Sequence, residues 1–286
     1  MACSSILEKD LACVFGSVRA KVLCCGNLTV MPVSQMAGDR FESFLCQKEN
    51  LVIGVALTTE VCRDALLSHP CTPSACIALG RLMTACALTG LVRAQGETSI
   101  QVLGDGVIGT VFSDVTREGH LRGTVKNPGA VVPASFLGSK TRRTIQRAIG
   151  RGSLSVMRYG DDMEFVQSIT PLVSGEVDLD VEYFINTSEQ VASALQCDVV
   201  LDDDGAIRVA GGIIVQTLPG AQASDIEQVR RAIHDGWADR LRAAASLDEL
   251  LSGFLPTFRG LDKPVSLAWK CRCSKARAVA ALAMLN

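Results

Sequence analysis

Two cysteines near the end of the chain, Cys271 and Cys273, are separated by one residue and followed by Ser274. Thiolates at this spacing can both reach a zinc ion, which accepts soft sulfur ligands. The same pair can also form a disulfide that closes a small strained ring, so this disulfide is relatively oxidising and readily reduced. Ser274 is suited to cap a helix predicted over 275–285. The motif therefore indicates metal binding or a redox switch.

Acidic residues in the middle of the chain are the second group that could do chemistry. Glu176, Asp178 and Asp180 begin an apolar stretch, and residues 202–204 are three consecutive aspartates. Such acids could hold the metal of a hydrolase, but none of the three histidines is nearby in the sequence. Acids are also typical of a helix start and of a hairpin turn. A metal-dependent hydrolase is therefore only an alternative.

A thiol-disulfide oxidoreductase built on Cys271 and Cys273 is another alternative. It would need a Cys-X-X-Cys motif between a strand and a helix, as in a thioredoxin-like unit, and the sequence contains no such motif. A thiol-disulfide oxidoreductase is therefore also only an alternative.

The elements that position these groups are clearest in the middle of the chain. The stretch 174–190 has acids first and apolar residues on one helical face, which favours a helix, although part of it alternates like a strand. The β-branched runs 198–201 and 207–215 flank an Asp-Gly turn and predict a hairpin. Gly211 and Gly212 in the second run indicate a bulge or a close backbone approach.

The first half of the chain supplies the core. A strand is expected over 51–58, and Thr72 and Pro73 are suited to begin a helix over 74–92. This helix is apolar nearly all round, which predicts that it is buried. Short strands separated by turns over 99–125 predict a meander. We expect no apolar run long enough to span a bilayer.

Two further helices are predicted after residue 220, with capping boxes at Ser224 and Ser246. Each has an apolar stripe at helical spacing: Ile226, Val229, Ile233, Trp237 and Leu241 in the first, and Leu247, Leu250, Leu251 and Phe254 in the second. Gly236 in the middle of the first helix costs about 1 kcal/mol relative to alanine. The helices are therefore expected to adhere weakly to the rest of the fold.

Several of these motifs together resemble the heat shock protein 33 family of redox-regulated holdase chaperones. The motifs are SGEVDLDVEYFINTSEQ, then DDDG, AGG and VQTLPGA, the upstream LGDGVIGTVFSDVTREGHLRGTVKNP, and Cys271-Arg-Cys-Ser274. They occur in the family's order, and the resemblance extends from Phe41 to Asn286. The chain departs from the family at Ile53, where an arginine is usual, and at Lys275 and Ala276 after the cysteines.

The resemblance implies an α+β fold with mixed β-sheets packed around a largely buried helix, followed by a helical linker and a truncated zinc-binding module. The expected segments are an N-terminal extension over 1–39, a chaperone core over 40–220, a metastable linker over 221–268 and the start of a redox-switch zinc domain over 269–286.

The implied function is that of an ATP-independent holdase, which is not an enzyme, binds unfolding proteins under oxidative stress and prevents their aggregation. Cys271 and Cys273 would hold zinc in the reduced state and pair with each other on oxidation. The linker stripes would then be released to expose client-binding surface, and the activated protein is expected to form a homodimer. The family completes the zinc site with a later Cys-X-X-Cys motif, which is absent here, so we expect a truncated chain with an incomplete site.

The composition agrees with a globular protein. The chain has 286 residues, of which 48% are hydrophobic and 20% charged, and a formal net charge of -2, so neither nucleic acid nor a membrane is an expected partner. There are twelve cysteines but no evident signal peptide, which predicts reduced thiols in the cytoplasm, with an organelle such as the mitochondrion as the alternative. Cys62, Cys76, Cys86 and Cys197 are expected to be small buried residues.

Overall fold

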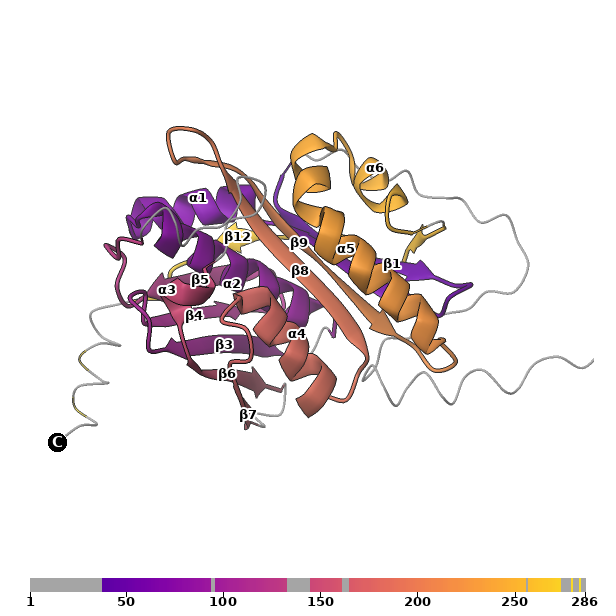
Figure 1. The fold of residues 1–286 in the computed structure, drawn as a ribbon, viewed down its shortest axis with the longest axis horizontal. Coiled ribbons are helices and arrows are strands. Elements are labelled where there is room, and N and C mark those ends of the chain that lie inside the picture. Colours follow the sequence, from indigo (N-terminus) through magenta and orange to yellow (C-terminus); the bar gives the residue numbers. More distant parts are fainter. Residues whose placement is uncertain are drawn as a thin grey trace, which may run out of the picture.

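The computed structural model of the protein describes residues 38–93, 96–132, 145–160, 165–255, 257–273, 279 and 283. Nearly all of the predicted N-terminal extension, Ser274 and most of the predicted helix over 275–285 lie outside these residues. The described part is a mixed α+β fold with two β-sheets (Figure 1).

The first sheet contains β1 (Arg40–Cys46), β2 (Leu51–Leu57), β8 (Ser193–Leu201), β9 (Ile207–Thr217), β10 (Arg259–Gly260) and β11 (Val265–Ser266). Its strand order is β10-β1-β2-β9-β8, and β11 also pairs with β1. The second sheet contains β3 (Glu97–Gly104), β4 (Thr110–Val115), β5 (His120–Val125), β6 (Gly152–Tyr159), β7 (Phe165–Pro171) and β12 (Ala268–Trp269). Its order is β12-β5-β4-β3-β6-β7, so the predicted meander is β3 to β5.

The helices of the described chain are α1 (Thr59–Ser68), α2 (Pro73–Leu91), α3 (Gln146–Ile149), α4 (Val177–Ser188), α5 (Ala223–Ala243) and α6 (Leu247–Ser252). α2 lies between the two sheets and contacts strands of both. All its residues from Ser74 to Leu91 are buried, as the sequence predicts. α2 is therefore the central helix of the core.

The start and the composition of α2 each differ from one expectation. Thr72 is at the N-cap position, but its hydroxyl donates a hydrogen bond to the carbonyl oxygen of Ala130 (2.7 Å) instead of capping the helix. Contrary to our expectation, α2 is long and apolar enough to cross a membrane. Its entire apolar window is buried inside the fold, as in the core helix of a folded domain.

The predicted helix and hairpin are α4 and the pair β8 and β9. Gly205 in the connecting turn has φ +84°, which suits glycine. Gly211 and Gly212 are not in a bulge, since the irregularity of the β8–β9 pair lies between Val200 and Leu201. They instead allow close approach, because a Cβ on Gly212 would lie 2.7 Å from the Cys197 sulfur.

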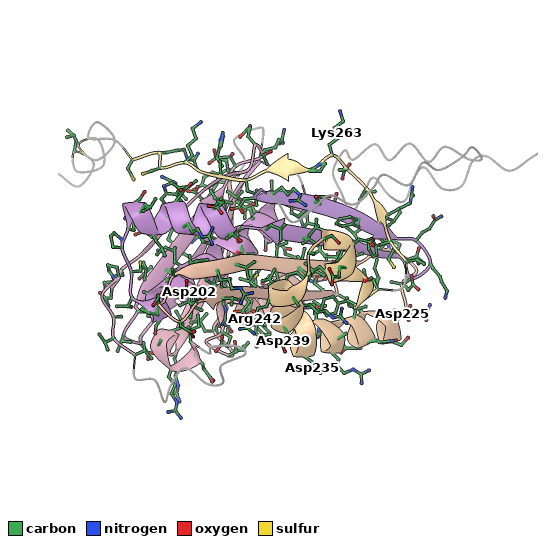
Figure 2. All side chains as sticks on the ribbon, turned by 90° about the horizontal axis from the view of Figure 1, so that it is seen from above. Asp202, Asp225, Asp235, Asp239, Arg242 and Lys263 are labelled. Atoms are coloured by element: carbon green, nitrogen blue, oxygen red, sulfur yellow. The ribbon has the colours of Figure 1, made fainter. Side chains whose placement is uncertain are left out.

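α5 and α6 cover the face of the first sheet that is turned away from α2, and we call residues 223–252 the cover. The eight stripe residues within these helices are buried and Phe254 is partly buried, against a separate apolar cluster from β1, β2, β8 and β9. The charged residues Asp235 and Asp239 of α5 are exposed (Figure 2). The cover thus adds a second hydrophobic layer to the fold.

The ends of the cover helices agree only in part with the predicted capping boxes. At α6 the Ser246 hydroxyl accepts a hydrogen bond from the Glu249 amide (3.1 Å), as predicted. The box predicted at Ser224 is wrong, because the N-cap of α5 is Gln222, two residues earlier, and the Ser224 hydroxyl donates to Asp225. Beyond α6 the predicted helical linker is not helical, since residues 259–266 contribute β10 and β11 to the first sheet.

Asp39, which precedes β1 and accepts a hydrogen bond from the Val61 amide in the first turn of α1, gives the fold a testable pH dependence. Burial raises its pKa to about 6, although hydrogen bonds from Val61, Glu60 and Thr59 oppose the shift. Because the pKa is higher in the folded state, Asp39 favours folding below pH 4, and this contribution, up to about 3 kcal/mol, is lost as pH rises through 6.

The substitution Asp39→Asn keeps an acceptor for the Val61 amide but cannot titrate. We expect the variant to be more stable than the parent at pH 7.5, with a difference that shrinks toward pH 4. Urea unfolding of both proteins at several pH values measures this difference. A difference that stays constant with pH would contradict the assignment.

Candidate functional site

The chain after the cover crosses from the first sheet to the second. β10 and β11 pair with β1, and β12 then pairs in parallel with β5. Backbone hydrogen bonds run from Leu267 to Asp39 (3.0 Å), from Ala268 to Gly119 (3.0 Å) and from Lys270 to Leu121 (2.8 Å). This strap, residues 259–273, brings the Cys-X-Cys motif against β3 and β4.

Cys271 and Cys273 lie together at the end of the strap, and both are exposed. The Cys273 amide donates a hydrogen bond to the Cys271 sulfur (3.4 Å). This bond and one from the Cys273 side chain lower the pKa of Cys271, because they stabilise its thiolate. An accessible thiol with a lowered pKa is the kind that reacts with oxidants.

The other described cysteines have the opposite character. Burial raises the pKa of Cys46 and Cys76 to about 12 and also raises that of Cys62 and Cys86. These thiols remain protonated at neutral pH and are poor nucleophiles. Cys62, Cys76, Cys86 and Cys197 are buried, as the sequence predicts. Cys271 is therefore the described cysteine best suited to redox chemistry.

The described residues do not by themselves fit a structural zinc ion. Such a site has four protein ligands, and Cys271 and Cys273 supply two thiolates. No group of three or more His, Cys, Asp or Glu suited to a metal occurs within the part of the chain that the structure describes. Zinc binding at Cys271 and Cys273 thus stays a prediction.

Arg272, between the two cysteines, makes a contact that the sequence did not indicate. One guanidinium nitrogen donates to Glu97 Oε1 (2.7 Å) and the other to Asp114 Oδ1 (2.8 Å). Glu97 is on β3 and Asp114 on β4, so the arginine bridges two strands of the second sheet. Its partners precede it by 175 and 158 residues, and no local pattern could have identified them.

The acids that suggested a hydrolase instead hold the backbone. Asp180 accepts hydrogen bonds from the amides of Val173 (2.8 Å), Ser174 (2.8 Å) and Gly175 (2.9 Å), and so fixes the turn before α4. Asp202 accepts bonds from two amides of its own turn. These acids are therefore part of the fold and are not gathered around a metal.

Asp178, another of the acids that suggested a hydrolase, closes the free edge of β8 together with Glu182 and Asp198. Glu182 accepts from the Leu195 amide (2.6 Å), Asp178 from the Cys197 amide (3.1 Å) and Asp198 from the Val199 amide (2.9 Å). The amides of three alternate residues of this edge strand, Leu195, Cys197 and Val199, are thus hydrogen-bonded to acids. Carboxylates in these positions keep the edge from pairing with another strand.

Arg81 of α2 joins Asp198 and a further acid, Glu176, in the core. It is fully buried and donates to Glu176 Oε2 (2.8 Å) and to Asp198 Oδ1 (2.8 Å). Burial alone would lower its pKa, but Asp198, Asp178 and Glu176 raise it above the usual value. The arginine therefore stays charged and ties α2 to β8 and to the start of α4.

The cover is attached to the core mainly by apolar packing and by a few polar contacts. Glu182 contacts Arg230 (3.0 Å) and His234 (3.0 Å) of α5, and Arg230 also donates to the Ser193 carbonyl oxygen (2.7 Å). Trp237 is 1% exposed and its indole nitrogen lies 3.4 Å from the Gly211 carbonyl oxygen. Loss of α5 would therefore uncover β8 and β9 while leaving the cluster around α2 in place.

Comparison with known proteins identifies similar chains over most of this length. A family model described as Hsp33 protein matches residues 39–286. A 33 kDa chaperonin from Thermus thermophilus is 32% identical over 252 residues, covering 83% of this chain and 73% of the relative. One from Staphylococcus carnosus is 32% identical over 225 residues, covering 77% and 75%.

A solved structure agrees with these relatives. The crystal structure of the 33 kDa chaperonin, or heat shock protein 33 homolog, of Thermotoga maritima superposes with a TM-score of 0.74 at 26% identity. The match covers 87% of this chain and 85% of that chain, so the two folds correspond over most of their length.

Proposed function

This chain belongs to the heat shock protein 33 family of chaperones, and from that premise we propose that it is a redox-regulated, ATP-independent holdase. In this function it binds unfolding proteins under oxidative stress and prevents their aggregation. The observation that carries the proposal is the cover, which buries an apolar face of the first sheet separate from the main core.

The face beneath the cover is suited to bind unfolded chains once it is exposed. It is formed by buried apolar residues of β1, β2 and β9, namely Phe44, Leu51, Ile53, Val55, Ile213 and Val215. Ile53, at the position where the family usually has arginine, extends this apolar surface. Contiguous exposed apolar surface binds apolar segments of other proteins, because association removes both from water.

The proposed trigger is the exposed thiol pair at the end of the strap. Peroxide oxidises Cys271 to a sulfenic acid, and attack by the Cys273 thiol forms the disulfide; overall, two thiols and one peroxide give one disulfide and two waters. The pair belongs to the strap that follows the cover, so a change at its end weakens the strap and then the cover. In this proposal the two thiols are themselves the sensor of peroxide.

Self-association, cellular location and zinc binding are further proposals that rest on membership of the family. We propose homodimer formation on activation, since exposed apolar faces of two copies can also bind each other. We also propose a cytoplasmic location, in which the thiols of Cys271 and Cys273 stay reduced until an oxidant appears. Zinc would require thiolates beyond Cys271 and Cys273.

The experiment that tests the function is aggregation of a thermally unfolding client without ATP, with the reduced and the peroxide-treated protein. Suppression only after oxidation would support the redox-regulated holdase. Suppression in both states would indicate a constitutive holdase, in which the switch is lost. If neither form suppresses aggregation, the holdase proposal is wrong for this chain.

Gly236 gives a way to strengthen the cover. A Cβ at this position would lie 3.5 Å from the Phe254 ring, which is ordinary van der Waals contact. We therefore expect Gly236→Ala to stabilise α5 by about 1 kcal/mol, and to slow activation by peroxide. Hydrogen exchange of the α5 amides measures the first effect and the client assay the second. Ala232→Gly, in the same helix, should have the opposite effects: faster exchange of the α5 amides and faster activation by peroxide.

A further inference from the structure

The side chains of the Cys-X-Cys motif point in different directions. Cys271 and Cys273 are exposed, whereas Arg272 between them reaches the second sheet and is largely covered. The motif therefore presents its thiols to solvent and its charge to the core. Any change in the backbone of the motif therefore alters the positions of both the thiols and the guanidinium group.

The bridge made by Arg272 is well placed to hold the strap. Asp114 is 2% exposed and accepts from Arg272 through Oδ1 and from Arg122 through Oδ2, so both oxygens of a buried carboxylate are used. Glu97 adds a second, more exposed carboxylate on the neighbouring strand. Charge-assisted bonds from one guanidinium to two fixed strands define the position of Arg272 closely.

Disulfide formation between the neighbours of Arg272 changes the geometry on which this bridge depends. A disulfide requires the two Cβ atoms to lie about 3.5–4.5 Å apart. Side chains at i and i+2 of an extended chain are on the same face but about 6.6 Å apart, so closing this distance bends the backbone at the middle residue. A bend at this position changes the direction of the Arg272 side chain relative to Glu97 and Asp114, its partners on β3 and β4.

We propose that Arg272 is a latch that positions the strap in the reduced protein, and that the disulfide of Cys271 and Cys273 and the Arg272 bridge exclude each other. The proposal rests on the proposed function because it names the contact through which thiol oxidation reaches the fold. Arg272 is a positioning residue and takes no part in the redox chemistry.

The latch has a reciprocal consequence that a purely structural arginine would not have. If the disulfide weakens the bridge, then loss of the bridge must favour the disulfide by the same factor. Arg272→Ala should therefore shift the Cys271–Cys273 thiol-disulfide equilibrium in a glutathione buffer toward the disulfide by at least about fivefold. Mass spectrometry of the alkylated 271–273 peptide measures the ratio.

Two further variants separate the latch from the charge of the arginine. Glu97→Ala removes one arm of the bridge and leaves Arg272 charged beside the thiols, so we expect a smaller shift in the same direction. Lys270→Ala removes a nearby positive charge but keeps the bridge, so the equilibrium should change less than twofold. Asp114 keeps its contact with Arg122 in all three variants, which preserves the fold.

Hydrogen exchange gives a second readout on the same proteins. The amides of Leu267, Ala268 and Lys270, which hold the strap, should lose protection in reduced Arg272→Ala and in the peroxide-treated parent. The latch is wrong if Arg272→Ala changes neither the thiol-disulfide equilibrium nor the protection of these amides. It is also wrong if Arg272→Ala or Lys270→Ala shifts the equilibrium and Glu97→Ala does not. These measurements need no client, so a failed aggregation assay would leave the latch standing.

Discussion

Replacing Arg81 with methionine should destabilise the protein by about 3–5 kcal/mol, because the substitution leaves buried carboxylates without their cation. Arg81 is fully buried and pairs with Glu176 and Asp198, which are 9% and 2% exposed. In the variant these acids must take up protons or draw water into the core, and both processes cost free energy. Urea unfolding at pH 7 measures the loss.

Matched variants test whether the loss comes from unpaired charge. Arg208, exposed on β9, provides the control, and Arg208→Met should change the free energy of unfolding by less than about 0.5 kcal/mol. Adding Glu176→Gln and Asp198→Asn to Arg81→Met removes the orphaned charges and should recover much of the stability. If Arg81→Met lowers the free energy of unfolding by less than about 1 kcal/mol, the charged groups of Arg81, Glu176 and Asp198 are solvated.

The elements that the sequence predicted correctly are those with a strong local pattern. α2 is apolar nearly all round, and the β8–β9 hairpin combines β-branched runs with an Asp-Gly turn. The stripe of α5 also follows from spacing alone. The start of α5 did not, because a capping box at Ser224 fits the letters but the hydroxyl bonds to Asp225 instead. Local sequence patterns therefore predict the presence and type of a helix or strand more reliably than its first and last residues.

Contacts between distant segments account for what the sequence did not show. β10, β11 and β12 have two residues each and exist because they pair with β1 and β5, so their own residues carry no strand pattern. The partners of Arg272 are equally remote. Arg81 could have indicated a buried acid, since a lone arginine in an apolar helix requires one, but no local pattern identifies Glu176 and Asp198 as its partners.

The largest functional effect is expected from Trp237, the aromatic residue of α5 that packs over β9. Trp237→Ala should weaken the attachment of the cover by about 3–5 kcal/mol, because a buried indole is lost together with its contact to Phe254. The α5 and α6 amides should then exchange about 10²- to 4 × 10³-fold faster, at about 1.4 kcal/mol per tenfold. The cluster around α2 contains no residue of the cover, so α2 should keep its protection.

If the cover controls client binding, reduced Trp237→Ala should suppress client aggregation without peroxide. Trp237→Phe keeps most of the apolar contact and should lie between the parent and the alanine variant in both exchange and suppression. Leu67→Ala removes a side chain that is 83% exposed on α1 and should change neither. Faster exchange of the cover without suppression would show that the face beneath it does not bind clients. Because Trp237 is 34 residues before Cys271, constitutive suppression by this variant would show that release of the cover is sufficient for client binding without oxidation of the thiols.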